Sequence, residues 1–536
     1  MSLLQDIPIL SIILLSPLLG LALVLLLPKH RAGSLKTSAI VASLVPLALS
    51  FWLFADYNKY GGGEGYKEYT VWMEWFIRFR ESTIFQYYLD IDGLSLPLLL
   101  LTVLVTALAA FASVHIKKRW KSFYIWFFVL EFGMIGVFMA RDLILFFVFF
   151  EITLVAMYYL IGVWGYYNRE RAANQFLIYN GIGSAIMLIV FVILIYTAGL
   201  TVDLEAEKAF FSASYDVIAA NLADPAAYVN FSPSQASIVD TFHLDKGEKW
   251  ALFTMLLVAF GIKLPIIPFH TWMLKVHKEA PPAVVMIHSA VLLKMGAYGL
   301  IRFGLFLFPE QAREFSAAMA GLGVASLLYG AILAFRQQEF KLVLAYSSIS
   351  HMGIVLIGLA SFNELGFQGA VFQLVSHGLI SALLFLIVGS LYERTGTTEL
   401  PQLGGLARSM PFLSGVLLTA GLASLGLPGL SGFVGELLSL LGLFETEKWL
   451  AAAAVIGIIL TAVYMLRSVM KITFGPQKES FAALRDTRFI EAFPMIVLLA
   501  FIVLLGCYPS VLTDTIEISM AGIMEQLHAI RPEVKP

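Results

Sequence analysis

The chain has 536 residues, of which 59% are hydrophobic and 13% are charged, and its mean hydropathy is +0.84. Soluble domains contain about 45 to 50% apolar residues, so this composition indicates a membrane protein. A net charge of −2 provides no basic surface for nucleic acid, and the one cysteine, Cys507, excludes both an internal disulfide and a thiolate metal cluster.

Apolar runs long enough to cross a bilayer recur along the chain. A membrane helix needs about 20 mostly apolar residues, and this rule predicts an all-α polytopic protein with about fourteen transmembrane helices. The first run lacks the basic leader and the cleavage site of a signal peptide, so it is interpreted as a membrane helix. The predicted spans are residues 8–27, 37–55, 93–115, 122–140, 142–164, 175–198, 250–273, 283–308, 315–335, 341–361, 366–391, 411–443, 449–471 and 490–512.

The loops between these spans predict the orientation of the chain. Two connections are long, residues 56–91 and 201–249, and both are dominated by Asp and Glu; the second is also aromatic and is expected to cap one membrane face. Because short cytoplasmic loops collect Lys and Arg, the odd-numbered connections are expected to face the cytoplasm and both termini to lie outside. Those connections carry Lys29, Arg31, Lys36, Lys117, Lys118, Arg119, Lys121, Arg169, Arg171, Arg467, Lys471, Lys478, Arg485 and Arg488.

Spans 7 and 12 are interrupted at matching places. Span 7 contains Pro265 and Pro268 in GIKLPIIPFHTW, and span 12 contains Pro428 in ASLGLPGLSGFVGEL. Broken helices are tolerated at membrane depth only beside protein or a wet cavity. If helices 4 to 8 and 9 to 13 are two repeats of five, the second repeat is inverted, as in many transporters; the alternative is two unrelated proline kinks. The predicted division is 1–121 for helices 1 to 3, 122–308 for the first repeat, 309–475 for the second and 476–536 for helix 14 and the tail.

Ionisable residues inside the apolar spans are the main functional signal. A charge at the bilayer centre costs about 2.5 to 3.5 kcal/mol, so such residues usually face the bundle interior and mark ion or proton paths. We therefore predict a proton pathway through this chain. Its candidate residues are Glu131, Glu151, Lys263, Lys294, His351, His377 and Glu436.

Two of these residues are expected to form a switchable pair. Glu151 lies near the middle of span 5, and Lys263 lies at the break in span 7. Burial weakens the hold of a lysine on its proton and a carboxylate about 4 Å away restores it, so closing the pair would load a proton and opening it would release one. The alternative is a static ion pair that fixes helix packing. Lys294 has no acid in its own span, which suits an intermediate that receives protons through ordered water.

The remaining candidates carry less specific signals. His351 and His377 can relay protons because imidazole titrates near neutral pH, although a lone histidine is often a packing residue. No ligand spacing accompanies them, so a metal site is not expected. Glu436 follows the break in span 12 and is predicted to hold a proton at the far end of the path, with helix capping as the alternative. Glu131 is assigned equally to coupling and to structure, and His277 is interpreted as structural, together with His270.

Motifs for other chemistry are absent from the sequence. There is no G-x-G-x-x-G unit, no Walker loop and no cysteine set for an iron-sulfur cluster. We expect no cofactor in this chain, no oxidation of NADH by it and no ATP hydrolysis.

Five stretches are specific enough to identify a family. They are DIDGLSLPLLLLT, FFVFFEITLVAMYYLIGVWG, the segment from KLPIIPFHTW through HKEAPP to LLKMGAYGLIRF, AYSSISHMG and GLPGLSGFVGEL. Over roughly residues 90 to 510 the chain resembles the antiporter-like membrane subunits shared by NADH-quinone oxidoreductase (complex I) and the Mrp cation/proton antiporters.

The resemblance implies specific roles. A glutamate on helix 5, lysines on helices 7 and 8 and a terminal charge on helix 12 fall on Glu151, Lys263, Lys294 and Glu436. It implies a proton-translocating subunit in the bacterial plasma membrane, with antiporter-like L and N neighbours. NADH, flavin, iron-sulfur clusters and quinone are expected in partner subunits.

The sequence also favours one branch of the family. Subunits L and N and the antiporter subunits generally carry Lys where this chain has Glu436, whereas subunit M carries Glu there, so the chain resembles subunit M at this position. It is also too short to contain the long lateral helix of subunit L. It departs from the usual pattern at Leu274, Lys275 and Leu342, and His288 resembles the L and Mrp pattern. A chloroplast-type counterpart of M, an Mrp-type sodium/proton antiporter subunit and a structural membrane scaffold remain the alternatives.

Overall fold

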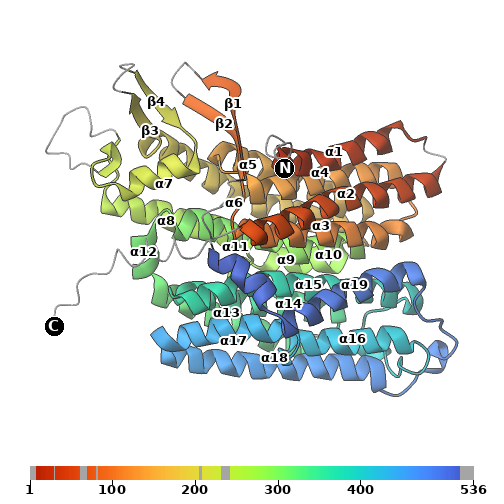
Figure 1. Ribbon diagram of the computed structural model, residues 1–536. Helices are drawn as coiled ribbons and strands as arrows, with labels where there is room; N and C mark the ends of the chain where they lie inside the picture. The colour runs from red at the N-terminus through yellow and green to blue at the C-terminus, as the bar shows by residue number, and fades with distance from the viewer. Residues whose placement is uncertain are drawn as a thin grey trace.

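The computed structural model describes residues 8–28, 31–60, 69–79, 83–203, 208–230 and 242–518. Within these ranges the chain is a bundle of long helices that run alongside one another (Figure 1). Twelve of the described helical segments are long and apolar enough to cross a membrane, which confirms the predicted all-α multi-pass fold. Predicted spans 7 and 12 are each divided into two helices and are not among the twelve. Both helices of span 12 are short, whereas the first helix of span 7 (Lys246–Lys263) is long enough but carries too many charged residues.

The first half of the bundle contains the predicted spans 1 to 8. Span 7 consists of α8 and α9, and span 8 is one continuous helix in which two π-helical segments, η6 and η7, enclose the short α11. The elements are α1 (Ile9–Leu26), α2 (Ala32–Tyr60), α3 (Ser95–Ala112), α4 (Trp120–Met139), α5 (Leu143–Trp164), α6 (Arg169–Thr197), α7 (Tyr215–Ala223), α8 (Lys246–Lys263), α9 (Thr271–Glu279), α10 (Pro282–Ile287), η6 (His288–Leu292), α11 (Leu293–Gly299), η7 (Leu300–Leu305) and α12 (Pro309–Glu314).

The second half contains the predicted spans 9 to 14. Span 12 consists of α16 and α17, which are separated by a glycine-rich break, and α19 returns the chain against α3 and α15. The elements are α13 (Ser316–Arg336), α14 (Phe340–Ala360), α15 (Glu364–Thr395), α16 (Pro411–Ser424), α17 (Ser431–Thr446), α18 (Lys448–Phe474) and α19 (Phe489–Cys507).

The two long connections, which were expected only as loops, meet in one sheet at one end of the bundle (Figure 1). Its strands are β1 (Thr70–Phe79), β2 (Thr83–Asp90), β3 (Leu200–Asp203) and β4 (Lys208–Ser212), in the order β1-β2-β4-β3. The β1 and β2 strands are rich in aromatic and β-branched residues, which favour strands. The parallel pairing of β2 with β4 joins segments that are far apart in the sequence, so a pass along the chain could not find it.

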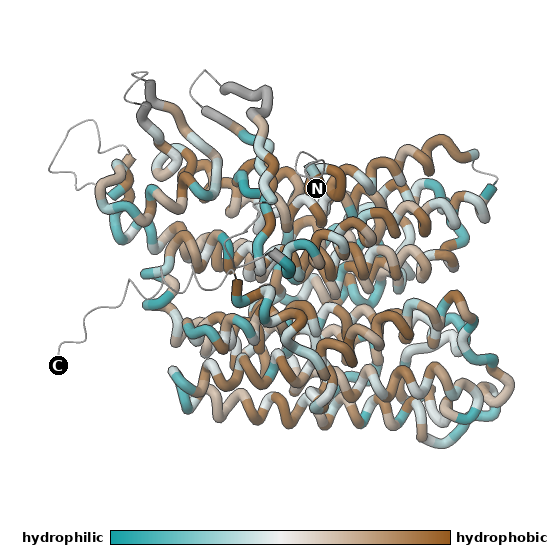
Figure 2. The backbone as a smooth tube through the Cα atoms, viewed as in Figure 1, coloured by the Kyte–Doolittle hydropathy of each residue, from teal (hydrophilic) through white to brown (hydrophobic). Residues whose placement is uncertain are grey.

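The distribution of hydropathy follows this architecture. Hydrophobic residues cover most of the long helices, and hydrophilic residues gather at their ends (Figure 2). The helix from Pro282 to Leu305 and the helix α15 are fully buried along their most apolar windows, whereas the corresponding windows of α1, α18 and α19 are only 39%, 33% and 33% buried. Lys294 of span 8 and His377 of α15 therefore lie in the interior of the molecule.

Candidate functional site

The central feature of the site is a direct contact between Lys294 and His377. Lys294, on α11, is completely buried, and its Nζ atom lies 2.8 Å from Nδ1 of His377 on α15. The same ammonium group donates a hydrogen bond of 2.7 Å to the backbone carbonyl of Ser289, five residues earlier. This carbonyl belongs to the π-helical segment η6, where the regular α-helical pairing of carbonyls is interrupted. The sequence predicted both residues but not their contact.

The row of titratable side chains continues from His377 to Glu436. The rings of His377 and His351 are 5.2 Å apart between their centroids, and Nδ1 of His351 lies 3.5 Å from Oε1 of Glu436. All three side chains are buried, each with 4% of its surface exposed. Lys294, His377, His351 and Glu436 thus form one continuous row across α11, α15, α14 and α17.

Nδ1 of His351 is hydrogen-bonded to Gln373 and not to Glu436, whose Oε1 atom has no hydrogen-bond partner among the described residues. The amide Nε2 of Gln373 lies 3.2 Å from Nδ1 of His351, and Oγ of Ser424 lies 3.5 Å from Nε2 of the same ring. A ring nitrogen that accepts a hydrogen bond from an amide cannot donate one to a carboxylate at the same time. Transfer of a proton to Glu436 therefore requires His351 to exchange one partner for the other.

The break between α16 and α17 makes room for Glu436. Gly426 and Gly429 in this break have φ angles of +77° and +90°, which disfavour any residue with a Cβ atom. A Cβ atom on Gly426 would lie 2.4 Å from Oε2 of Glu436. The glycine at this position therefore allows the carboxylate to lie against the backbone of the break, at the end of the row.

The predicted pair of Glu151 and Lys263 is not closed in the structure. Lys263 is 2% exposed and its Nζ atom makes no hydrogen bond, and Oε1 of Glu151 is buried and also has no hydrogen-bond partner within the described ranges. The ammonium group instead lies over the ring of Phe150, 4.6 Å from its centroid, and 5.6 Å from that of Phe176. Glu151 still acts on Lys263 electrostatically, but at a separation larger than an ion pair.

Two histidines lie between the lysines, and sequence reasoning assigned neither of them to the path. Nε2 of His277 and Nδ1 of His288 are 2.9 Å apart, and both side chains are completely buried. Phe176 contacts the ring of His288 on one side and Lys263 on the other, while Lys294 acts electrostatically on both histidines. The other ring nitrogens, Nδ1 of His277 and Nε2 of His288, have no hydrogen-bond partner in the described structure. The signal that could have found this dyad is the position of His288 within the apolar run VVMIHSAVLL.

The structure places two other residues away from the row. Glu131 on α4 is completely buried and accepts a hydrogen bond of 2.9 Å from Oγ1 of Thr106 on α3, and its Oε2 atom has no partner in the described part of the chain. His270 is 5% exposed and packs edge-on against Tyr329. No contact within the described ranges joins either residue to Lys263, Lys294 or the histidines between them.

Comparisons with known proteins identify the family of the chain. Residues 140–461 match the family model described as NADH:quinone oxidoreductase/Mrp antiporter, TM. The chain is 35% identical to NADH-quinone oxidoreductase subunit M from Rhodobacter capsulatus over 97% of both chains. It is also 35% identical to NAD(P)H-quinone oxidoreductase chain 4 2 from Thermosynechococcus vestitus, over 98% of this chain and 94% of the relative. A chain of respiratory complex I from Thermus thermophilus with bound NADH has the same fold, with a TM-score of 0.80, 27% identity and coverage of 97% of this chain and 99% of that one.

Proposed function

Because the chain belongs to the family of NADH:quinone oxidoreductase and Mrp antiporter membrane subunits, we propose that it is a proton-translocating subunit of a NADH-quinone oxidoreductase. Two relatives are named as subunits of NADH-quinone or NAD(P)H-quinone oxidoreductase, and the similarity to this chain covers almost their whole length. The observation that carries the translocation role is the continuous row formed by Lys294, His377, His351 and Glu436. Each of these side chains can hold and release a proton.

The contacts define the transfer steps within this row. Lys294 holds a proton as an ammonium ion and donates it along the 2.8 Å contact to Nδ1 of His377. His377 passes a proton to the neighbouring ring of His351, and Glu436 accepts it there once Gln373 has released Nδ1. Imidazole suits the intermediate positions because it can be protonated and deprotonated near neutral pH.

Titratable residues that precede Lys294 in the chain would control its supply of protons. Glu151 and Lys263 form the switchable pair in this proposal, and the dyad of His277 and His288 connects Lys263 to Lys294. With the pair open, the charge of Lys263 is held by the face of Phe150. Movement of Glu151 toward Lys263 would favour the protonated lysine, and its withdrawal would favour release toward the histidines.

Translocation needs energy from outside this chain. Moving one charge against a potential of 100 mV costs about 2.3 kcal/mol, which must come from quinone reduction in partner subunits. We place the flavin, the iron-sulfur clusters and the NADH and quinone sites in those subunits, and antiporter-like L and N subunits beside this chain. We assign the chain to the bacterial plasma membrane, with both termini outside, and retain the division at residues 121, 308 and 475.

The test uses the assembled complex in membrane vesicles. Glu436→Gln keeps the size of the side chain and removes its ability to accept a proton, so quinone-linked proton translocation should fall at least about tenfold, which corresponds to about 1.4 kcal/mol. His270→Gln is the matched control, because His270 is buried but lies outside the row. Wild-type translocation in Glu436→Gln would contradict the proposed path.

Two rival functions predict different results. An Mrp-type subunit would translocate protons in exchange for sodium, so sodium dependence in vesicles that lack NADH-linked activity would favour it. A structural scaffold would lose assembly when a buried charge is removed. Glu151→Ala should lose translocation and still assemble, whereas loss of the complex from the membrane would support the scaffold.

A further inference from the structure

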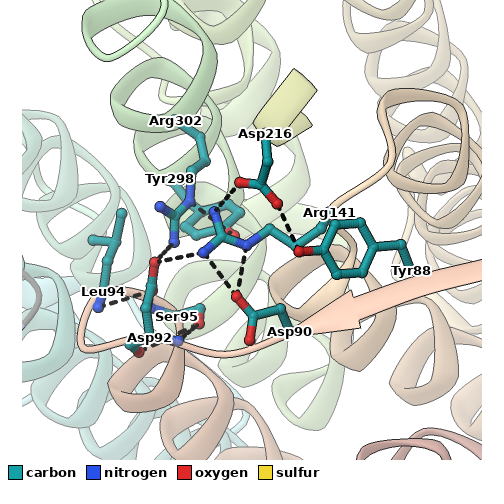
Figure 3. Close-up of polar contacts among 9 residues, drawn as sticks. All are labelled: Tyr88, Asp90, Asp92, Leu94, Ser95, Arg141, Asp216, Tyr298 and Arg302. Carbon is teal, nitrogen blue, oxygen red and sulfur yellow. Dashed lines mark hydrogen bonds and ion pairs between the residues drawn. The ribbon is translucent and has the colours of Figure 1, made fainter. Parts of the chain in front are cut away.

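We propose that the ion pair between Asp92 and Arg302 is a latch that fixes the rotational register of the helix carrying Lys294. Asp92 and Arg302 are then positioning residues for transfer from Lys294 to His377, and this role rests on the function proposed above. The latch lies at the sheet end of the bundle, where α3, α5, α7 and η7 meet (Figure 3).

The latch joins the start of α3 to the end of span 8. Arg302 donates a hydrogen bond from Nη2 to Oδ2 of Asp92, although the two residues are 210 positions apart in the sequence. The side chains of Arg302 and Asp92 are only 5% and 13% exposed. Asp92 is fixed in turn by its other oxygen, Oδ1, which accepts hydrogen bonds from the backbone N–H groups of Leu94 at 3.1 Å and Ser95 at 2.9 Å. Arg302 therefore binds an anchored carboxylate.

Arg141 connects this anchor to the neighbouring elements. Its Nη2 atom lies 3.5 Å from Asp92 and 2.8 Å from Asp90, and its Nη1 atom lies 3.9 Å from Asp216 on α7. Tyr88 of β2 donates a hydrogen bond of 2.6 Å to Asp216 (Figure 3). The anchor is thus held by β2, by the connection between α4 and α5, and by α7.

The charge state of Asp92 suits a permanent contact. Burial is the largest influence and would raise the pKa of this carboxyl, but the guanidinium groups of Arg302 and then Arg141 outweigh it and hold the pKa well below its usual range. Asp92 is therefore ionised at every pH at which the protein would work.

The helical geometry connects the latch to Lys294. Residues 294, 298 and 302 recur at intervals of four and so lie along one side of the helix, and Nε of Arg302 donates to the hydroxyl of Tyr298 at 3.4 Å. Arg302 lies inside the π-helical segment η7, whose hydrogen bonds join residues five apart and so span one residue more than those of an α-helix. Conversion of η7 to α-helix would rotate the preceding residues by about 100° and shift them by about 1.5 Å. The Nζ atom of Lys294 would then leave Nδ1 of His377.

The test separates charge from shape at Asp92, in the assembled complex in membrane vesicles. Asp92→Asn keeps the size of the side chain and an oxygen for the two backbone N–H groups but removes the ion pair, whereas Asp92→Glu keeps the charge and changes the length. We expect proton translocation per quinone reduced to fall about tenfold in Asp92→Asn and less in Asp92→Glu. Because the latch holds Lys294 against His377, the pH profile of translocation should also shift in Asp92→Asn.

Asp224→Asn is the control, because Asp224 directly follows α7 but lies outside this cluster, where its side chain accepts a hydrogen bond of 2.9 Å from the backbone N–H of Ala226. It should behave as the wild type. Equal or better translocation in Asp92→Asn than in Asp92→Glu, or an unshifted pH profile, would overturn the latch. If Asp92→Asn does not assemble, Arg302→Lys replaces it in the test, because a lysine keeps the charge but not the planar guanidinium group. A loss of translocation of about threefold would then support the latch, and wild-type translocation would overturn it.

A parallel measurement of Lys294→Met distinguishes failure of the latch from failure of the proposed translocation function. Lost translocation in Lys294→Met together with wild-type behaviour of Asp92→Asn overturns the latch alone. Translocation that persists in Lys294→Met overturns the proposed function itself.

Discussion

The two halves of the candidate path differ in how their charged groups meet. In the second half, Lys294 contacts His377 at 2.8 Å and Glu436 lies 3.5 Å from His351. In the first half, Lys263 makes no hydrogen bond to the described residues and lies over the ring of Phe150. Lys294 thus has a titratable partner at hydrogen-bond distance, whereas Lys263 has none among the described residues.

The surroundings of the helices explain this difference. The helices α14 and α15, which carry the histidines of the second half, are 89% and 100% buried along their apolar windows. The helix α5, which carries Glu151, is 56% buried, and its neighbour α6 is 44% buried. Glu151 therefore lies on a helix that the rest of this chain covers less completely than α14 and α15. In the proposed path, the open half, which contains Glu151 and Lys263, would receive the signal, and the closed half, from Lys294 to Glu436, would conduct the proton.

Replacement of Lys294 should have the largest effect. Lys294→Met removes the proton carrier and its two hydrogen bonds, and hydrogen bonds to charged groups contribute about 1.5 to 3 kcal/mol each. We expect translocation by membrane vesicles to fall at least about tenfold. Lys246→Met is the control, because Lys246 is 60% exposed and pairs with Glu314 at the surface. A small loss in Lys294→Met would mean that the closed half does not conduct.

Gly426→Ala should have the next largest effect, because it disturbs the end of the closed half. Its φ of +77° would cost about 1 to 3 kcal/mol for a residue with a Cβ atom, and that atom would displace Glu436. We expect about threefold to tenfold less translocation and a lower unfolding temperature of the purified complex. In the control Gly415→Ala, on the helix α16, the new Cβ atom meets nothing within 4 Å. Equal results for the two variants would show that Glu436 does not depend on the break.

Phe150→Leu tests the open half, and its effect should be smaller. Cation–π contacts contribute about 0.5 to 2 kcal/mol, so loss of the ring should change translocation by about threefold. Phe149→Leu is the control: Phe149 is buried on the same helix, but it packs against Phe132 and not against Lys263. The translocation rates of Phe150→Leu and Phe149→Leu are measured in the same vesicles. A larger loss in Phe150→Leu than in Lys294→Met would show that translocation depends more on the open half than on the closed half.

The membrane spans and their breaks could be predicted because they depend on local composition. Apolar runs, and the prolines and glycines within them, identify both broken helices. The buried charges Lys294 and Glu436 were also evident, since a polar residue in an apolar run stands out in any sequence. Which of these residues touch was not evident, because contacts such as that of Lys294 with His377 join different helices.

The features that were missed depend on long-range packing. His288 stands out in its apolar run, but its partner His277 does not, and only the fold brings Nε2 of His277 to 2.9 Å from Nδ1 of His288. The π-helical turns around Lys294 have no sequence signature. Asp92 was read as part of a family motif, and its partner Arg302 is 210 residues away. Contacts of this kind follow from the fold and not from the pattern of residues.

The smallest predicted effect concerns Asp90, beside the latch that joins the sheet to the closed half. Burial is the largest influence and raises the pKa of Asp90 from 3.8 to about 6, although Arg141 offsets part of the shift. The folded chain then binds this proton more tightly than the unfolded chain, so the contribution of Asp90 to stability falls as the pH rises from about 4 through 6. Asp92 has the opposite shift and changes protonation only at lower pH, so it does not contribute to this slope. The unfolding temperature of the purified complex should therefore decrease by about 1 °C between pH 5 and pH 7 because of Asp90, and Asp90→Asn should remove that decrease. An identical slope in the variant would show that Asp90 is already ionised at pH 5, in which case Arg141 binds it as firmly as Arg302 binds Asp92.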